Sequence, residues 1–121
     1  MTELDNMEQF LFQLILHAGC ARSFAKEAGQ LAEDGDWEAA EKALADANDE
    51  QNEAHKINTT LITKAARGEH VDFSVLLVHA LDLLMLAWSE IDYTEQYLNV
   101  LKRVDNLEAE VEKWKKQASK K

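Results

Sequence analysis

The chain has 121 residues and a mass of 13.7 kDa, about the size of one domain, which excludes a multi-domain enzyme. It contains no proline and four glycines, so it lacks the turn residues of a many-stranded fold, and an all-α fold is expected. The net charge of −10 argues against a nucleic-acid partner, and no apolar run approaches the roughly 18 residues that direct membrane insertion requires.

Glycine-containing turns divide the chain into three predicted helices. The first covers roughly Asp5–Ala32. Asp36 can cap the second, which runs to about Ala66 and has an unusually polar middle at Asn48–His55. The predicted inner faces of these two helices consist of Phe10, Leu14, Ala18, Ala21, Ala25 and Ala28, then Trp37, Ala40, Ala43, Leu44, Ala47, Ala54, Leu61 and Ile62. The many alanines imply close contact between helices.

The third predicted helix follows the turn at Gly68 and meets no breaker before the C-terminus. Either Asp72 or Ser74 can cap it. From Val75 to Ile91 it is apolar nearly all the way round, and two partner helices cannot cover such a surface. We therefore expect self-association through this helix. Its clearly polar residues in this stretch are His79, Asp82, Ser89 and Glu90.

The last part of the third helix carries a heptad pattern, made of Val100, Val104, Leu107, Val111, Trp114 and Ala118. With Val104 at position a, the g and e positions pair Arg103 with Glu108 and Glu110 with Lys115, as a parallel coiled coil prefers. The alternative is a solvated amphipathic tail folded on its own bundle. The predicted units are a three-helix domain over residues 1–104 and a helical extension over residues 105–121.

His79 is the candidate for chemistry, because the sequence has no glycine-rich phosphate loop, no paired-cysteine metal motif and no hydrolase motif. It lies near the start of a helix, where the dipole stabilises an added phosphoryl group. Asp82 follows three residues later, close enough along the helix surface to influence the same site. The alternative for His79 is a hydrogen-bonded core residue.

Asp82 is a candidate metal ligand. If three copies of the third helix gather around a symmetry axis, three Asp82 carboxylates about 5 Å apart repel each other by several kcal/mol. Mg²⁺ or another hard divalent cation would neutralise them, and so would protonation. The alternative is a carboxylate hydrogen-bonded to a neighbouring subunit.

Three further residues have open roles. His17 in the first helix and His55 in the second can orient His79, bind a metal or simply make a hydrogen bond in a partly buried position. The single cysteine, Cys20, is interpreted as a core residue rather than a nucleophile. It cannot form an intrachain disulfide, and the sequence shows no leader segment, so we expect a cytoplasmic protein.

The chain resembles the lactose/cellobiose-type enzyme IIA component of the bacterial phosphoenolpyruvate-dependent sugar phosphotransferase system, over roughly Leu11–Lys102. The resemblance rests on three stretches and the Asp82 and Met85 that follow them: HAGCARS at 17–23, NEAH at 52–55 and GEHVDFSVLLVHA at 68–80. It implies a homotrimer of antiparallel three-helix subunits, nine helices in all. It also implies that HPr phosphorylates His79, that a cysteine of enzyme IIB receives the group, and that Asp82 and its symmetry mates hold a metal ion at the trimer axis.

The sequence departs from the family pattern beside its candidate site. The family usually has glutamine and histidine where this chain has Leu81 and Leu83. The lost polar groups leave two rivals to a phosphocarrier of disaccharide uptake. One is a trimeric regulatory paralogue that has lost efficient phosphotransfer, and the other is a helical assembly module in which His79 and Asp82 serve packing and trimer stability.

Overall fold

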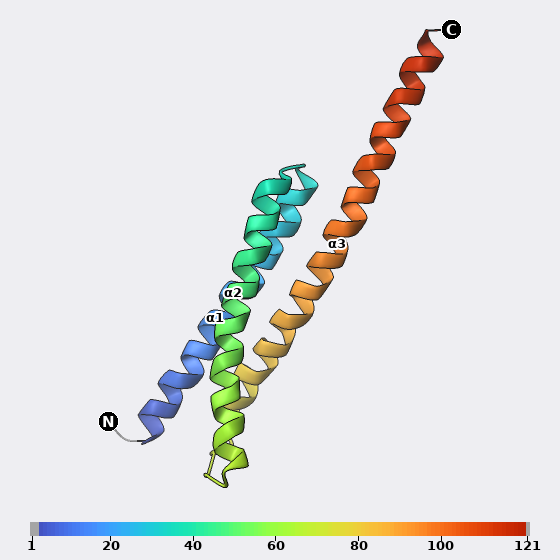
Figure 1. Cartoon of the computed structure of the whole chain (residues 1–121). Helices are drawn as coiled ribbons and strands as arrows, with labels where there is room; N and C mark the ends of the chain where they lie inside the picture. Colours follow the sequence, from blue (N-terminus) through green and yellow to red (C-terminus); the bar gives the residue numbers. More distant parts are fainter. Residues whose placement is uncertain (1–2, 121) are drawn as a thin grey trace.

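The computed structural model describes residues 3–120, with side-chain exposure from residue 6 onward, so the outer ends of the two predicted units, at 1 and 121, lie outside it. Three helices, α1 (Glu3–Glu33), α2 (Trp37–Ala66) and α3 (Val75–Ser119), run up, down and up again as an antiparallel bundle (Figure 1). The predicted all-α three-helix bundle is confirmed. Within the described range, no helix is both long and apolar enough to span a bilayer.

Glycines end the first two helices, as the sequence pattern predicts. Gly35 and Gly68 both have a φ of +81°, a left-handed conformation that glycine adopts without steric cost. The residue after each glycine donates its backbone N–H to a carbonyl five residues earlier, which is the Schellman arrangement. The Asp36 carboxylate then accepts a hydrogen bond of 3.3 Å from the Ala39 backbone N–H and caps α2.

Ser74, rather than Asp72, caps α3. The Ser74 hydroxyl oxygen accepts a hydrogen bond of 3.0 Å from the Leu77 backbone N–H, three residues into the helix. Asp72 instead pairs with the exposed His70 ring in the preceding turn. The cap therefore fixes the start of α3 a few residues before His79.

The core is built from small side chains. Its fully buried large residues are Leu11, Leu14 and Leu84, and most other buried positions are alanines, which let the three helices approach closely.

Two predictions about the core need correction. Ile62 is 59% exposed, because it lies about 100° round α2 from the buried Leu61 and so points away from the core, and Cys20 is a free thiol at the half-buried edge of the core rather than inside it.

Two side-chain contacts set the register of α1 against α3. Arg22 donates a hydrogen bond of 2.9 Å to the Glu90 carboxylate, and the Thr94 hydroxyl donates one of 3.4 Å to the Ala25 carbonyl. The members of these pairs are 68 and 69 positions apart in the chain. A residue of α1 therefore lies level with the α3 residue whose number is about 68 higher.

The third helix continues well beyond the other two (Figure 1). Near the α1–α2 turn, Lys102 contacts Glu41 at 3.2 Å and the Trp37 indole donates a hydrogen bond of 3.0 Å to Asp105. Every residue from 106 to 120 is exposed. The alternative of a tail folded back on its own bundle is therefore wrong, because the helix runs on straight past its last partners.

Candidate functional site

His79 lies in the second turn of α3, at the end of the bundle where α2 and α3 are joined (Figure 1). Its side chain is exposed, so the alternative of a buried core histidine is wrong. No hydrogen bond joins its ring to another of the described residues 6–120. An exposed imidazole without such a partner is accessible to another macromolecule and keeps a nitrogen lone pair for reaction.

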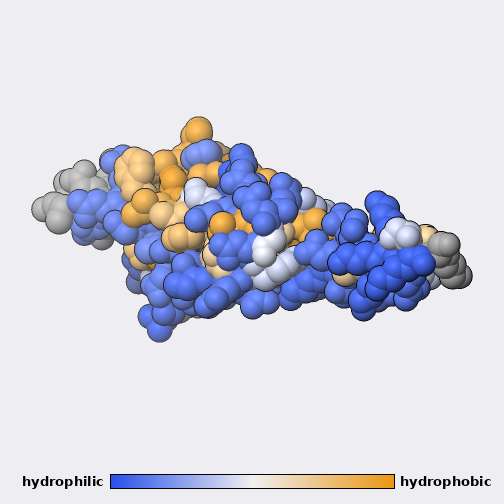
Figure 2. All heavy atoms as spheres, turned by 90° about the horizontal axis from the view of Figure 1, so that it is seen from above, coloured by the Kyte–Doolittle hydropathy of each residue, from blue (hydrophilic) through white to orange (hydrophobic). Residues whose placement is uncertain are grey.

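Asp82 lies three residues after His79, on the side of α3 opposite the buried Ala80 and Leu84. It is exposed and is surrounded by exposed apolar residues of the same helix. We call this surface the outward face; it consists of Val75, Val78, Asp82, Met85, Leu86 and Ser89. Figure 2 shows the hydrophobic residues gathered on one side of the molecule, whereas hydrophilic residues cover most of the opposite side.

A metal ion would need more than one chain at this face. Among the described residues, no group of three histidine, cysteine, aspartate or glutamate side chains could hold a cation. Asp82 supplies the oxygen ligand that hard divalent cations prefer, but one carboxylate is too few. The donor therefore fits such an ion only where copies of Asp82 converge.

The two leucines that replace polar residues of the family pattern are both half-buried. Leu83, one helical turn after His79, packs against the main core cluster. Leu81 lies on another side of α3, because it is two residues from His79 and one from Asp82. Neither side chain can donate a hydrogen bond to the His79 ring.

His17 does not join His79. Its Nδ1 lies 2.6 Å from the Glu50 carboxylate of α2, and both side chains are partly buried. By the register of α1 against α3, His17 lies level with residue 85, about 9 Å further along the bundle than His79 at 1.5 Å per residue. Its contact joins α1 to α2, which is a structural role.

The other two histidines have contacts of their own, with Trp88 and Asp72. The His55 ring packs edge-on against the Trp88 ring, with centroids 5.5 Å apart, and so helps to join α2 to α3. His70 is exposed in the turn before α3, as predicted. His79, beside Asp82 on the second turn of α3, is therefore the one of the four histidines that remains a candidate for chemistry.

Sequence reasoning missed two polar contacts between helices. Gln51 is 5% exposed, and its Nε2 donates a hydrogen bond of 3.3 Å to the backbone carbonyl of Leu84. Arg22 and Glu90 form the ion pair described above, and the hydrogen bond that Arg22 donates to the Glu90 carboxylate raises the pKa of Arg22. The polarity of Asn48–His55 signals that something unusual lies there, but the partners are distant in sequence.

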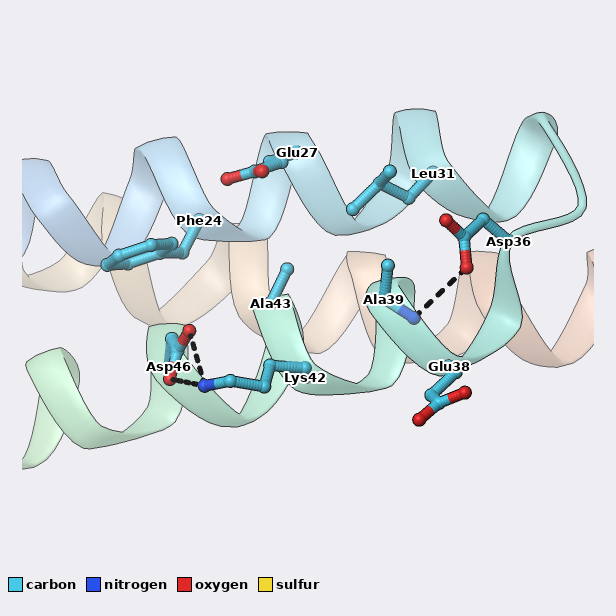
Figure 3. A pocket seen from close by; sticks show the side chains of 9 residues that line it. All are labelled: Phe24, Glu27, Leu31, Asp36, Glu38, Ala39, Lys42, Ala43 and Asp46. Atoms are coloured by element: carbon cyan, nitrogen blue, oxygen red, sulfur yellow. Dashed lines mark hydrogen bonds and ion pairs between the residues drawn. The ribbon is translucent and has the colours of Figure 1, made fainter.

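A shallow pocket of about 470 Å³ lies between α1 and α2 at the other end of the bundle from His79 (Figure 3). Its single cation is already engaged, since Lys42 pairs with Asp46, and Asp36 caps α2. It offers no free cation for a phosphoryl group. The lining residues are Phe24, Glu27, Leu31, Asp36, Glu38, Ala39, Lys42, Ala43 and Asp46.

Comparisons with known proteins all point to the same protein family. The family model described as "PTS system, Lactose/Cellobiose specific IIA subunit" matches residues 9–102. The lichenan-specific phosphotransferase enzyme IIA component of Bacillus subtilis is 41% identical over 83% of this chain and 91% of its own length. The lactose-specific EIIA component of Lacticaseibacillus casei is 36% identical over 89% of this chain and 96% of its own.

A solved structure agrees with the sequence matches. The crystal structure of the cellobiose-specific enzyme IIA from Bacillus anthracis superposes with a TM-score of 0.81 and 42% identity, covering 88% of this chain and 94% of that one. The resemblance inferred from the motifs is confirmed. The chain belongs to the lactose/cellobiose-specific enzyme IIA family and is a phosphotransferase component of a sugar phosphotransferase system.

Proposed function

We propose that His79 accepts a phosphoryl group from phospho-HPr and passes it to a cysteine of enzyme IIB during uptake of a lactose-, cellobiose- or chitobiose-type disaccharide. The observation that carries this proposal is the exposed imidazole in the second turn of α3, with no hydrogen-bond partner among the described residues. Family membership supplies the phosphotransfer context. The two enzyme IIA relatives named above are specific for lichenan and lactose although both resemble this chain, so we place the choice of sugar outside its own site.

The proposed chemistry asks little of the protein. The lone pair of a neutral His79 nitrogen attacks the phosphorus in line as the bond to the donor's histidine breaks, and the bonding pair returns to the donor's ring. A thiolate of enzyme IIB later attacks the same phosphorus, and the His79 ring is the leaving group. The chain must present the ring to two partners in turn, which an exposed position allows. The nearby N-terminus of α3 favours the phosphoryl charge.

We propose further that the chain assembles as a homotrimer through the outward face. This face exposes large apolar side chains that one bundle cannot cover, with Val75 at 83% and Met85 at 59% exposed. In a three-fold arrangement, copies of Asp82 would hold Mg²⁺ or a related divalent cation at the axis. The bound cation would offset the repulsion between the carboxylates and so stabilise the assembly.

The proposed location is the cytoplasm. Phosphotransfer from HPr requires a compartment in which both proteins meet. The free Cys20 thiol also suits a reducing environment.

Intact-mass spectrometry at mildly alkaline pH tests the phosphocarrier role. The chain is incubated with phosphoenolpyruvate, the first enzyme of the system and HPr, and a gain of about 80 Da, one phosphoryl group, is expected. His79→Gln should lose the gain. His70→Gln is the matched control, because His70 is exposed and lies outside the candidate site, and it should keep the gain. No gain with an HPr that phosphorylates another enzyme IIA would overturn the proposal.

A regulatory or structural relative is the second candidate. The observation that favours it is the packing of Leu83 against the core, which leaves no polar group one turn after His79. This candidate predicts a trimer that is never phosphorylated at His79. A helical assembly module predicts the same mass result, together with an assembly that chelation weakens. The mass measurement therefore separates both from the phosphocarrier.

A further inference from the structure

The extension of α3 carries an apolar stripe that nothing in one chain covers. We call it the seam; it consists of Val100, Val104, Leu107, Val111, Trp114 and Ala118. Leu107 is 65% exposed and Trp114 is 72% exposed. The family match ends at residue 102, so most of the seam lies beyond the part of the chain that the family model describes.

An uncovered helix of this length needs support. The extension continues a helix that α1 and α2 already support, so it bears no new nucleation cost, but most helical stability in proteins comes from packing of an apolar face rather than from propensity. Residues 106–119 lie beyond the last contacts of α3 with α1 and α2. Their side-chain interactions are mainly exposed ion pairs within the helix, such as Lys113 with Glu110 at 3.5 Å. Such pairs contribute only a few tenths of a kcal/mol. A partner for the seam would supply the missing stabilisation.

The seam continues the outward face along the same side of α3. Val100 follows Asp82 by eighteen residues, which is five full turns at 3.6 residues per turn. Leu107 follows Ser89, and Val104 follows Leu86, by the same interval. α3 is unbroken from Val75 to Ser119, so the alignment persists along its whole length. Whatever covers the outward face is thus in position to cover the seam.

Charges beside the seam favour copies of this chain as the partner. With Val104 at heptad position a, Arg103 and Glu110 occupy g positions, and Glu108 and Lys115 occupy the e positions that follow them. In a parallel arrangement each g residue faces the next e residue of a neighbour, so both pairs unite opposite charges.

We infer that the seam packs against the seams of other copies in a parallel coiled coil, coaxial with the proposed trimer, on which this inference rests. The extension then acts as an assembly device outside the phosphotransfer bundle. It clamps the α3 helices together at the end remote from His79. This surface leaves the region around His79 open to HPr and enzyme IIB.

Disulfide cross-linking of the full chain tests the arrangement. In a Cys20→Ser background, single cysteines are placed at the two ends of the seam, Val100→Cys and Ala118→Cys. A parallel, in-register coil brings each cysteine beside its own copy, so each variant should form linked pairs of chains on mild oxidation. Ala109→Cys is the matched control, because Ala109 is exposed on the opposite side of the extension, and it should remain unlinked.

Other patterns of linkage overturn the inference. Links that form only when the Val100→Cys and Ala118→Cys variants are mixed indicate an antiparallel pair. No links at either position, while sedimentation shows a trimer, indicate an extension left free for another protein or a surface. Linked pairs whose native assembly, measured by sedimentation, contains two chains rather than three contradict the coaxial trimer.

A charge in the seam gives a second, independent measurement. Leu107→Asp should raise the protein concentration at which the assembly dissociates in sedimentation equilibrium by more than about tenfold, because a carboxylate would enter a dry interface. Ala109→Asp, two residues away on the opposite side, should leave it unchanged. Circular dichroism of both variants verifies that the exposed sites tolerate the change.

The two proposals fail in different ways. A chain that gains the phosphoryl mass without linking refutes the coiled coil and leaves the phosphocarrier intact. A chain that forms disulfide links at both ends of the seam but never gains the phosphoryl mass refutes the phosphocarrier and leaves the coiled coil intact.

Discussion

Gln51 of α2 and Leu84 of α3 are joined by a hydrogen bond of 3.3 Å from the glutamine Nε2 to the leucine backbone carbonyl. The amide is buried among alanines and leucines, and its Oε1 has no hydrogen-bond partner among the described residues. The Nε2 group thus helps to fix the register of α2 against α3. The Oε1 atom has lost its hydrogen bonds to water without gaining another, which costs free energy of folding.

Substitutions of Gln51 should separate these two effects. Gln51→Ala should lower the free energy of unfolding by about 1–3 kcal/mol, because it leaves a cavity and removes the interhelical bond. Gln51→Met fills the same space and removes the unpaired oxygen, so its cost should stay below about 1 kcal/mol. Urea unfolding at one fixed protein concentration measures both values. An equal loss in the two variants would mean that the hydrogen bond, rather than volume, dominates.

The sequence predicts interactions between residues close in the chain, such as helix caps, but not contacts between residues of different helices. The ends of α1 and α2 follow from glycine and a capping aspartate, which act within a few residues. The start of α3 was ambiguous because Asp72 and Ser74 can both cap. The structure resolves it through the contact between Asp72 and His70.

Contacts between helices were beyond sequence reasoning. A buried glutamine is recognisable only once Leu84 is known to lie opposite, thirty-three positions away. Ile62 fits the apolar period of α2, yet it is exposed beside the buried Leu61, because periodicity identifies a broad face and cannot show how much of that face the neighbouring helices cover. The candidate site was predictable because His79 and Asp82 lie on one helix, where spacing alone sets their relation.

The ion pair between Arg22 and Glu90 should contribute modestly to stability. Both side chains are more than a third exposed, so a double-mutant cycle with Arg22→Gln and Glu90→Gln should give a coupling of about 0.5–1 kcal/mol. The Glu90 hydrogen bond raises the pKa of Arg22, so this contribution is fully present below the unfolded pKa and is lost only in strongly alkaline solution. The coupling should therefore be the same at pH 6 and pH 9. A marked fall between these values would contradict the assigned cause.

Removing the Asp82 charge should change how the assembly responds to chelation. With the wild-type chain, EDTA should promote dissociation, because carboxylates about 5 Å apart then repel by several kcal/mol. Asp82→Asn removes the repulsion, so its assembly should persist with or without EDTA, as measured by sedimentation equilibrium. The exposed Glu95 lies on another side of α3, and Glu95→Gln should behave as wild type. A wild-type assembly indifferent to EDTA at low protein concentration would exclude a metal at the axis.

Leu83→His should speed the phosphorylation of His79. The new imidazole would lie one helical turn after the His79 ring, where it can donate a hydrogen bond to the incoming phosphoryl group or orient the ring. We expect the rate of mass gain from phospho-HPr to rise by about tenfold, which is less than the roughly 10²–10³-fold effect of one fully preorganised donor.

The lost leucine packing should lower the free energy of unfolding by about 1–2 kcal/mol. Leu77→His is the matched control, because Leu77 is also half-buried against the core but lies on a different side of α3 from His79. It should show the stability loss without the gain in rate. An equal change in rate in both variants would show that loosening of the helix, and not a new donor, limits the transfer.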